Sequence, residues 1–126
     1  MAHPVSKGHF EALVERALAE LPPQFARVLE EVPIEIRARP TRAELRSVGL
    51  GEEDLLLGLY RGRPRTVRSV EDSGTMPDVI YIFQEDVELA CDSEDELVRQ
   101  VRTTVLHEIG HHFGMSEEDL DALGYG

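Results

Sequence analysis

The sequence predicts an α+β fold in one domain, and three observations support that prediction. The chain has 126 residues, close to the commonest size of a single domain. Apolar residues recur at helical spacing near both ends of the chain. Between these two regions, short apolar or alternating runs bounded by turn residues indicate strands. We therefore expect residues 1–126 to form a single domain in which a small sheet packs against helices.

The first elements expected are two helices and a strand. From Ser6 to Leu21 apolar side chains recur at helical spacing, and Pro22-Pro23 ends this amphipathic helix. A second, shorter helix is expected from Gln24 to Glu31. The stretch from Val32 to Ala38 then alternates apolar and polar residues, which predicts a half-buried strand.

The middle of the chain is expected to supply the rest of the sheet. Residues 39–53 are polar and rich in turn residues. Three further strands are predicted in the order Leu55 to Tyr60, Thr66 to Val70 and Asp78 to Phe83, with turns or loops at 61–64 and 71–77. The last of these strands carries the strongest apolar signal.

A long helix follows the strands. Ser93 and Glu96 fit the capping box that starts a helix, and Gly114 is placed to end it after Phe113. One broad apolar stripe along this helix should face the sheet. It consists of Leu97, Val98, Val101, Val105, Ile109 and Phe113.

The chain is acidic, with 25 Asp and Glu against 13 Lys and Arg and a formal net charge of −12. Such a surface repels phosphate backbones, so no nucleic-acid partner is expected. Arginines gather between Arg37 and Arg68, which leaves room for a locally basic face. No apolar run approaches the roughly 20 residues that span a bilayer, and Met1 to Gly8 lacks an apolar signal core. We expect a soluble, cytoplasmic protein with no membrane partner.

The sequence contains one cysteine, Cys91, so no disulfide can form within the chain. No partner base is indicated for it. We expect Cys91 to be a small buried hydrophobic residue near the start of the long helix rather than a nucleophile.

The sequence His107-Glu108-Ile109-Gly110-His111 lies on the predicted long helix. Its two histidines, four residues apart, lie about 40° apart around the helix axis. Each can therefore direct one ring nitrogen to a shared point about 2.0–2.1 Å from a zinc ion. Glu108 lies on the adjoining edge of the helix, where its carboxylate can take a proton from a metal-bound water and deliver it to a leaving group. The spacing predicts one zinc ion per chain, with a solvated polar helix face as the alternative interpretation.

A catalytic zinc with two histidine ligands needs a third protein ligand and an open position. Gly114 permits a sharp turn after the helix. Glu117 lies ten residues beyond the first histidine, where the metzincin pattern has its third histidine. Glu117 is therefore the predicted third ligand, with Asp119 and Glu118 as alternatives. The same acidic residues also fit the first turn of a last helix from Ser116 to Leu123, which is compatible with metal binding.

Several residues outside this ligand set receive secondary interpretations. Thr104 and Gln100 continue the Glu108 edge of the helix one and two turns back and are expected to line a cleft. His112 is expected to be a hydrogen-bonded core residue or to support a ligand, whereas His3 and His9 are expected on the surface. The run from Arg61 to Arg68 is expected to be a solvated loop face. Three tyrosines are possible oxyanion donors, although packing is the commoner role for each; they are Tyr60, Tyr81 and Tyr125.

Four blocks of the sequence resemble the minimal bacterial zincin-like metallopeptidase family. They are Leu56-Leu57-Gly58-Leu59-Tyr60, Pro77-Asp78-Val79-Ile80-Tyr81, the stretch Val105 to Gly114, and Leu123-Gly124-Tyr125. The resemblance covers nearly the whole chain from about Ala12 onward. It implies a compact zincin-like fold, in which a small mixed sheet packs against the C-terminal motif helix and the N-terminal helix. It also implies His107 and His111 as metal ligands, Glu108 as general base and an acidic third ligand. The family commonly shows Asp ten residues after the first histidine, where this chain has Glu117.

These observations together predict a zinc-dependent metallopeptidase that hydrolyses a peptide or protein substrate. Zincins bind an extended peptide along an edge strand, and both Val79 to Phe83 and Leu55 to Tyr60 are candidates for that strand. A non-catalytic metal-binding or regulatory module is the first alternative. A metal-dependent endoribonuclease of the H-x3-H-x5-H type is weaker, because it requires a histidine at Glu117 and a basic surface. The sequence leaves the oligomeric state open.

Overall fold

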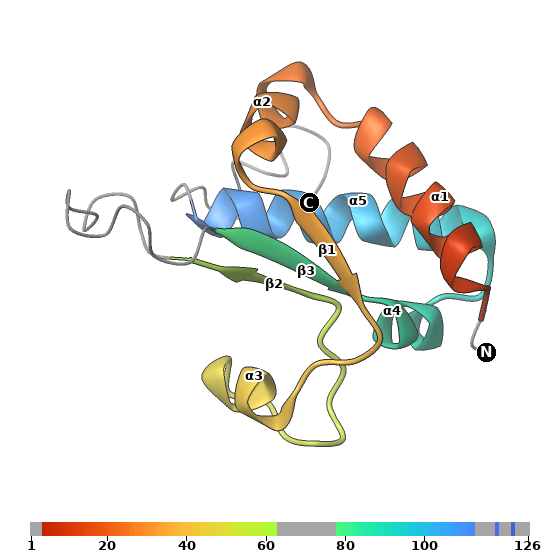
Figure 1. Ribbon diagram of the computed structural model, residues 1–126, viewed down its shortest axis with the longest axis vertical. Helices are drawn as coiled ribbons and strands as arrows, with labels where there is room; N and C mark the ends of the chain where they lie inside the picture. The colour runs from red at the N-terminus through yellow and green to blue at the C-terminus, as the bar shows by residue number, and fades with distance from the viewer. Residues whose placement is uncertain (1–3, 63–77, 113–117, 119–121, 123–126) are drawn as a thin grey trace.

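The computed structural model describes residues 4–62 and 78–112, together with residues 118 and 122 (Figure 1). In this part of the chain, a three-stranded sheet packs against one long helix and is accompanied by shorter helices. The helices are α1 (Lys7–Ala19), α2 (Pro23–Glu31), α3 (Arg42–Ser47), α4 (Gln84–Ala90) and α5 (Glu94–His112). The strands are β1 (Ile34–Arg37), β2 (Gly58–Arg61) and β3 (Val79–Phe83). The predicted α+β class is confirmed.

The sheet has the order β1-β3-β2, so β3 is its central strand. It pairs in parallel with β1, where Ile34 lies opposite Ile80, and antiparallel with β2, where Tyr60 lies opposite Ile80. All five residues of β3 are buried, which explains its continuous apolar sequence. Because β3 is paired on both sides, its candidacy as the peptide-binding edge strand is wrong. The other candidate segment contains β2, which is an edge strand.

The main core lies between the sheet and α5. Ile80 and Ile82 point from β3 toward α5, since alternate residues of a strand face the same side. Five of the six residues in the predicted stripe of α5 are buried there, and Phe113 lies outside the described residues. Helix α1 packs on α5 through Phe10, Leu13, Val14 and Ala17. The helix therefore has apolar contacts both with the sheet and with α1.

The opposite face of the sheet carries a second, smaller core. Val79, Tyr81 and Phe83 are buried there, with Leu56 and Leu59 packed against them. Figure 1 shows α3 on this side of the sheet, away from α5. The α3 segment is tied to β1 by an ion pair between Arg37 and Glu44, whose Nη1 and Oε2 atoms are 2.8 Å apart.

Helix starts agree with the local sequence signals where those signals exist. Ser6 caps α1 by accepting a hydrogen bond from the His9 backbone N–H at 3.2 Å. At α5, the Glu96 N–H donates to Ser93 Oγ at 3.2 Å, while the Glu96 carboxylate accepts from the N–H of Asp92. The predicted capping box is thus present in one half, and the return bond is shifted by one residue.

Two short helices are the remaining differences from the sequence expectations. Helix α3 lies in the segment expected to be turns, and α4 follows β3 without an intervening loop; neither is predicted by the sequence pattern. The strand predicted at 66–70 lies outside the described residues. Among the described helices, none combines the length and the apolar character needed to cross a membrane.

Candidate active site

The motif residues His107 to His111 lie in the last turns of α5. Because the helix is continuous from Glu94 to His112, His107 and His111 are separated by one helical turn, as predicted. His107 is partly buried, and its Nε2 atom is shielded from solvent. The side chain of His111 lies outside the described part of the structure.

The third position of the expected ligand set lies beyond the described residues. Glu117 and Asp119 are both outside them, and Glu118 is exposed. Within the described residues, no group of three or more His, Cys, Asp or Glu side chains is placed to hold a metal ion. The complete set of His107, His111 and Glu117 therefore stays a prediction.

Strand β2 lies directly against α5, one turn before the motif. A Cβ atom at Gly58 would lie 2.5 Å from Thr104 Cγ2 and 3.0 Å from the carbonyl oxygen of Tyr81, so only glycine fits this approach. Thr104 is buried under the strand, and its Oγ1 accepts a hydrogen bond from Gln100 Nε2 at 3.3 Å. The expectation that Thr104 lines a cleft is therefore wrong, because β2 covers it.

Further along, β2 reaches the motif itself. Two residues advance a strand by about 6.6 Å, and four residues advance an α-helix by about 6 Å. Because the two distances are nearly equal, a strand that contacts Thr104 at Gly58 reaches Glu108 at Tyr60. At the second position the Tyr60 backbone N–H donates to Glu108 Oε1 at 2.8 Å. Glu108 is partly buried. Its carboxylate therefore lies at the end of β2, in contact with the strand's backbone.

The pairing of β2 with β3 explains why the Tyr60 N–H points to Glu108 and not to β3. The N–H of Phe83 donates to the Leu57 carbonyl at 3.0 Å, and the register is antiparallel. Alternate residues of β2 therefore direct their backbone groups to β3, and Gly58 and Tyr60 direct theirs away from it. The edge of β2 that does not bind β3 is thus the edge that faces Glu108.

The three tyrosines have different surroundings. The Tyr60 phenol donates to Asp78 Oδ2 at 2.9 Å, and Asp78 is buried. The ring of Tyr81 is on the face of the sheet away from α5, under the guanidinium groups of Arg37 and Arg61. Tyr81 is therefore not placed to donate to an oxyanion near Glu108. Tyr125 lies outside the described residues.

The remaining predicted residues are accounted for as follows. Cys91 is buried, as expected, and burial raises the pKa of its thiol, with Glu96 and Asp92 adding to the rise. His9 is exposed and pairs with Glu94. His3, the side chain of His112 and residues 63–68 lie outside the described part of the chain.

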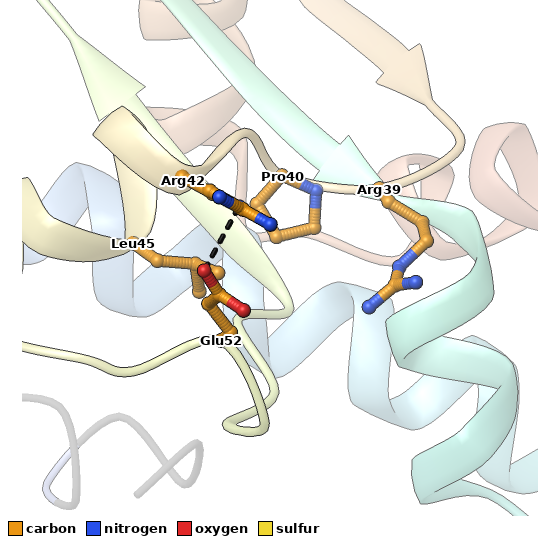
Figure 2. A pocket seen from close by; sticks show the side chains of 5 residues that line it. All are labelled: Arg39, Pro40, Arg42, Leu45 and Glu52. Carbon is orange, nitrogen blue, oxygen red and sulfur yellow. Dashed lines mark ion pairs between the residues drawn. The ribbon is translucent and has the colours of Figure 1, made fainter.

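A pocket of about 310 Å³ lies beside α3 (Figure 2), and Figure 1 shows α3 on the side of the sheet away from α5. Its lining includes Arg39 and Arg42, both from the segment expected to give a locally basic face. Arg42 pairs with Glu52, whose Oε1 lies 2.9 Å from Arg42 Nε. This ion pair neutralises part of the local positive charge. None of the residues that line the pocket belongs to the His107–His111 motif.

Two comparisons with known proteins match most of the chain. A family model described as zincin-like metallopeptidase matches residues 29–126. Among solved structures, a conserved hypothetical protein from Thermo thermophilus is similar, with a TM-score of 0.56 and 24% sequence identity. The match covers 94% of this chain and 99% of that one, and it supports the fold. No curated protein matches the chain.

Proposed function

Because the chain belongs to the zincin-like metallopeptidase family, we propose that it is a zinc-dependent peptidase. In this proposal His107 and His111 hold one zinc ion per chain, with Glu117 as the third ligand. Glu108 is the general base, and the substrate is a peptide or protein. Two imidazoles and a carboxylate are a donor set that catalytic zinc sites use, so the chemistry of these side chains fits the metal.

The position of Glu108 is the observation that carries this proposal. Its carboxylate is held 2.8 Å from the Tyr60 N–H, at the edge of β2 that points away from β3. A peptide that adds to this edge would bring its backbone carbonyl groups close to Glu108. The helix that carries both histidines and the strand suited to bind an extended peptide thus meet at one carboxylate.

The chain's own residues supply the proton transfers and the alignment. Zinc, when bound, supplies Lewis-acid chemistry that acidifies a water molecule and polarises a carbonyl group. Glu108 accepts the proton of the attacking water and passes it to the nitrogen of the departing amine, so the carboxylate ends the cycle as it began. The outward carbonyl groups of Gly58 and Tyr60 hold the substrate extended beside that carboxylate, while the Tyr60 N–H holds Glu108 itself.

The test is to replace the carboxylate while keeping its shape. We expect Glu108→Gln to lose at least a hundredfold in turnover of a fluorogenic peptide library, because a general base contributes about 10²–10⁴-fold. Zinc content by mass spectrometry should stay near one per chain. Glu85→Gln, which changes an exposed glutamate on α4, is the matched control and should keep full turnover.

Two results would count against the proposal. Undiminished turnover in Glu108→Gln would remove Glu108 from the chemistry. A wild-type protein that retains zinc but cleaves no peptide in the library would favour the non-catalytic metal-binding module.

A further inference from the structure

Asp78 is a buried carboxylate beside the proposed active site that the chemistry above does not use. Its side chain is only 5% exposed, and it immediately precedes β3. Burying a carboxylate is costly unless hydrogen bonds compensate for the lost water. One such bond is present, because the Tyr60 phenol donates to Asp78 Oδ2 at 2.9 Å.

The register of the sheet brings Tyr60 and Asp78 together. Tyr60 lies opposite Ile80, so Asp78, two residues earlier, is its diagonal neighbour on the same face. Diagonal neighbours lie about 7–8 Å apart at the backbone, within reach of a tyrosine side chain. The phenol therefore ties the end of the edge strand β2 to the start of the central strand β3.

A glycine leaves the space that this bond requires. Extending the same register places Gly62 opposite Asp78. A Cβ atom at Gly62 would lie 2.1 Å from Asp78 Oδ1 and 2.5 Å from its Cγ. Any larger residue at position 62 would displace the Asp78 side chain, and with it the acceptor of the Tyr60 phenol.

Tyr60 therefore contacts two carboxylates through two different groups. Its phenol donates to Asp78, and its backbone N–H donates to Glu108. We propose that Asp78 and Tyr60 are positioning residues, which fix the end of β2 so that the Tyr60 N–H holds the Glu108 carboxylate in place. This inference rests on the proposed function, in which Glu108 is the general base.

The local structure makes such an anchor useful. Strand β2 is four residues long, and its last residue, Arg61, is exposed. The end of a short edge strand frays readily, because few backbone hydrogen bonds hold it. A phenol fixed to the central strand keeps the residue-60 N–H in position, and that N–H orients one oxygen of Glu108.

The first experiment measures this contact without any turnover. Amide hydrogen exchange is followed by NMR in the metal-free protein, at residue 60 and at Leu59, whose N–H points to β3. In Tyr60→Phe and Asp78→Ala we expect the amide of residue 60 to exchange at least tenfold faster than in the wild type, an acceleration that corresponds to the loss of about one hydrogen bond. The exchange rate of the Leu59 amide should stay within twofold of the wild-type rate. Asp78→Asn keeps an acceptor oxygen and should restore most of the protection. Tyr81→Phe removes a phenol from the other face of the sheet and is the matched control.

The second experiment measures peptide turnover of the zinc-loaded variants. Tyr60→Phe should lower kcat about tenfold, because a misplaced catalytic group is costly, with KM within twofold and zinc content unchanged. Tyr81→Phe should keep the wild-type kcat. In a Glu108→Ala background, Tyr60→Phe should cause no further loss, since the group it positions is gone.

The outcomes separate this inference from the proposed function. A residue-60 amide that keeps its wild-type exchange rate in Tyr60→Phe, while Glu108→Ala accelerates it, would overturn the inference. Equal acceleration at Leu59 would do the same, because it would mean general fraying of the sheet. Absence of wild-type turnover would defeat the proposed function, yet the exchange rates would still decide whether Asp78 holds this contact. Should Asp78→Ala fail to fold, the milder Tyr60→Phe decides.

Discussion

The two faces of the β2–β3 pair are built from adjacent residues but pack in different ways. Toward α5, Gly58 lets the strand touch Thr104, and the Tyr60 backbone reaches Glu108. Away from α5, the Tyr81 ring is covered by two guanidinium groups, at 4.4 and 5.1 Å from its centroid. The first face is a close, directional contact between a strand and a helix. The second is an apolar layer closed by long charged side chains.

This difference indicates how the site is supported. A close strand–helix contact tolerates little change in volume, because the neighbouring atoms cannot move apart without moving an entire element. Long arginine side chains, in contrast, adapt to small changes beneath them. We therefore expect substitutions on the α5 face to be more damaging than those on the opposite face.

The largest difference in the free energy of unfolding is expected between substitutions in the two apolar cores, one on each face of the sheet. Ile80 is fully buried between the sheet and α5, and Ile80→Ala should cost about 2–5 kcal/mol in the free energy of unfolding. Leu59, on the other face, is only partly buried, so Leu59→Ala should cost clearly less. Urea denaturation of both variants measures the two costs. Equal losses would break the proposed distinction between the faces.

The next largest effect on stability is expected at the contact between Gly58 and Thr104. Gly58→Ala should destabilise the protein by about 1–3 kcal/mol, because its new methyl group meets Thr104 Cγ2. Thr104→Ser removes that methyl while keeping the hydroxyl that Gln100 contacts, so the double variant should recover part of the loss. Thermal unfolding of the two single variants and the double variant gives the coupling energy. Strictly additive losses would show that the two side chains do not meet.

A smaller effect is expected from the arginines that cover Tyr81. Arg61→Ala should cost about 0.5–1 kcal/mol, the usual range for an exposed cation–π contact. Arg37→Ala should cost more, since Arg37 also pairs with the partly buried Glu44. Chemical denaturation at low and high salt would separate the two contributions. A larger loss for Arg61 than for Arg37 would contradict this ranking.

The smallest effect is the pH response of Cys91, whose pKa is raised chiefly by burial. The folded state holds the thiol proton of Cys91 more tightly than the unfolded chain does. The stability that this difference contributes is therefore fully present below the pKa of the thiol in the unfolded chain. It is lost as the pH rises through the folded pKa. We expect slow alkylation by iodoacetamide at pH 8 in the native protein and fast alkylation in urea. Equal rates in both conditions would mean that Cys91 is accessible.

Local signals were sufficient for several elements of the fold. The apolar run of β3, the capping residue Ser93 of α5 and the proline after α1 each act within a few residues, and each element forms where the sequence predicts it. Helix α3 carries a similar signal, because Thr41 and Glu44 form a capping box. Its six residues are too short to show an apolar period, and so the pattern is easily taken for a turn.

Helix α4 and the support of Glu108 depend on distant contacts instead. At the start of α4, no side chain caps the helix, and the buried Asp86 accepts a hydrogen bond from the Leu56 N–H, 30 residues away. The contact between Tyr60 and Glu108 joins residues 48 apart and requires the correct strand register. Spacing within one helix proposes roles for His107 and Glu108, but it could not show which strand holds that carboxylate.

The proposed zinc site on α5, with Glu108 beside it, is best examined by a calorimetric zinc titration of the protein and its variants. We expect one zinc per wild-type chain, no binding in His107→Ala or His111→Ala, and full binding in Glu108→Gln. Unchanged zinc binding in both histidine variants, or no binding by the wild-type protein, would contradict it.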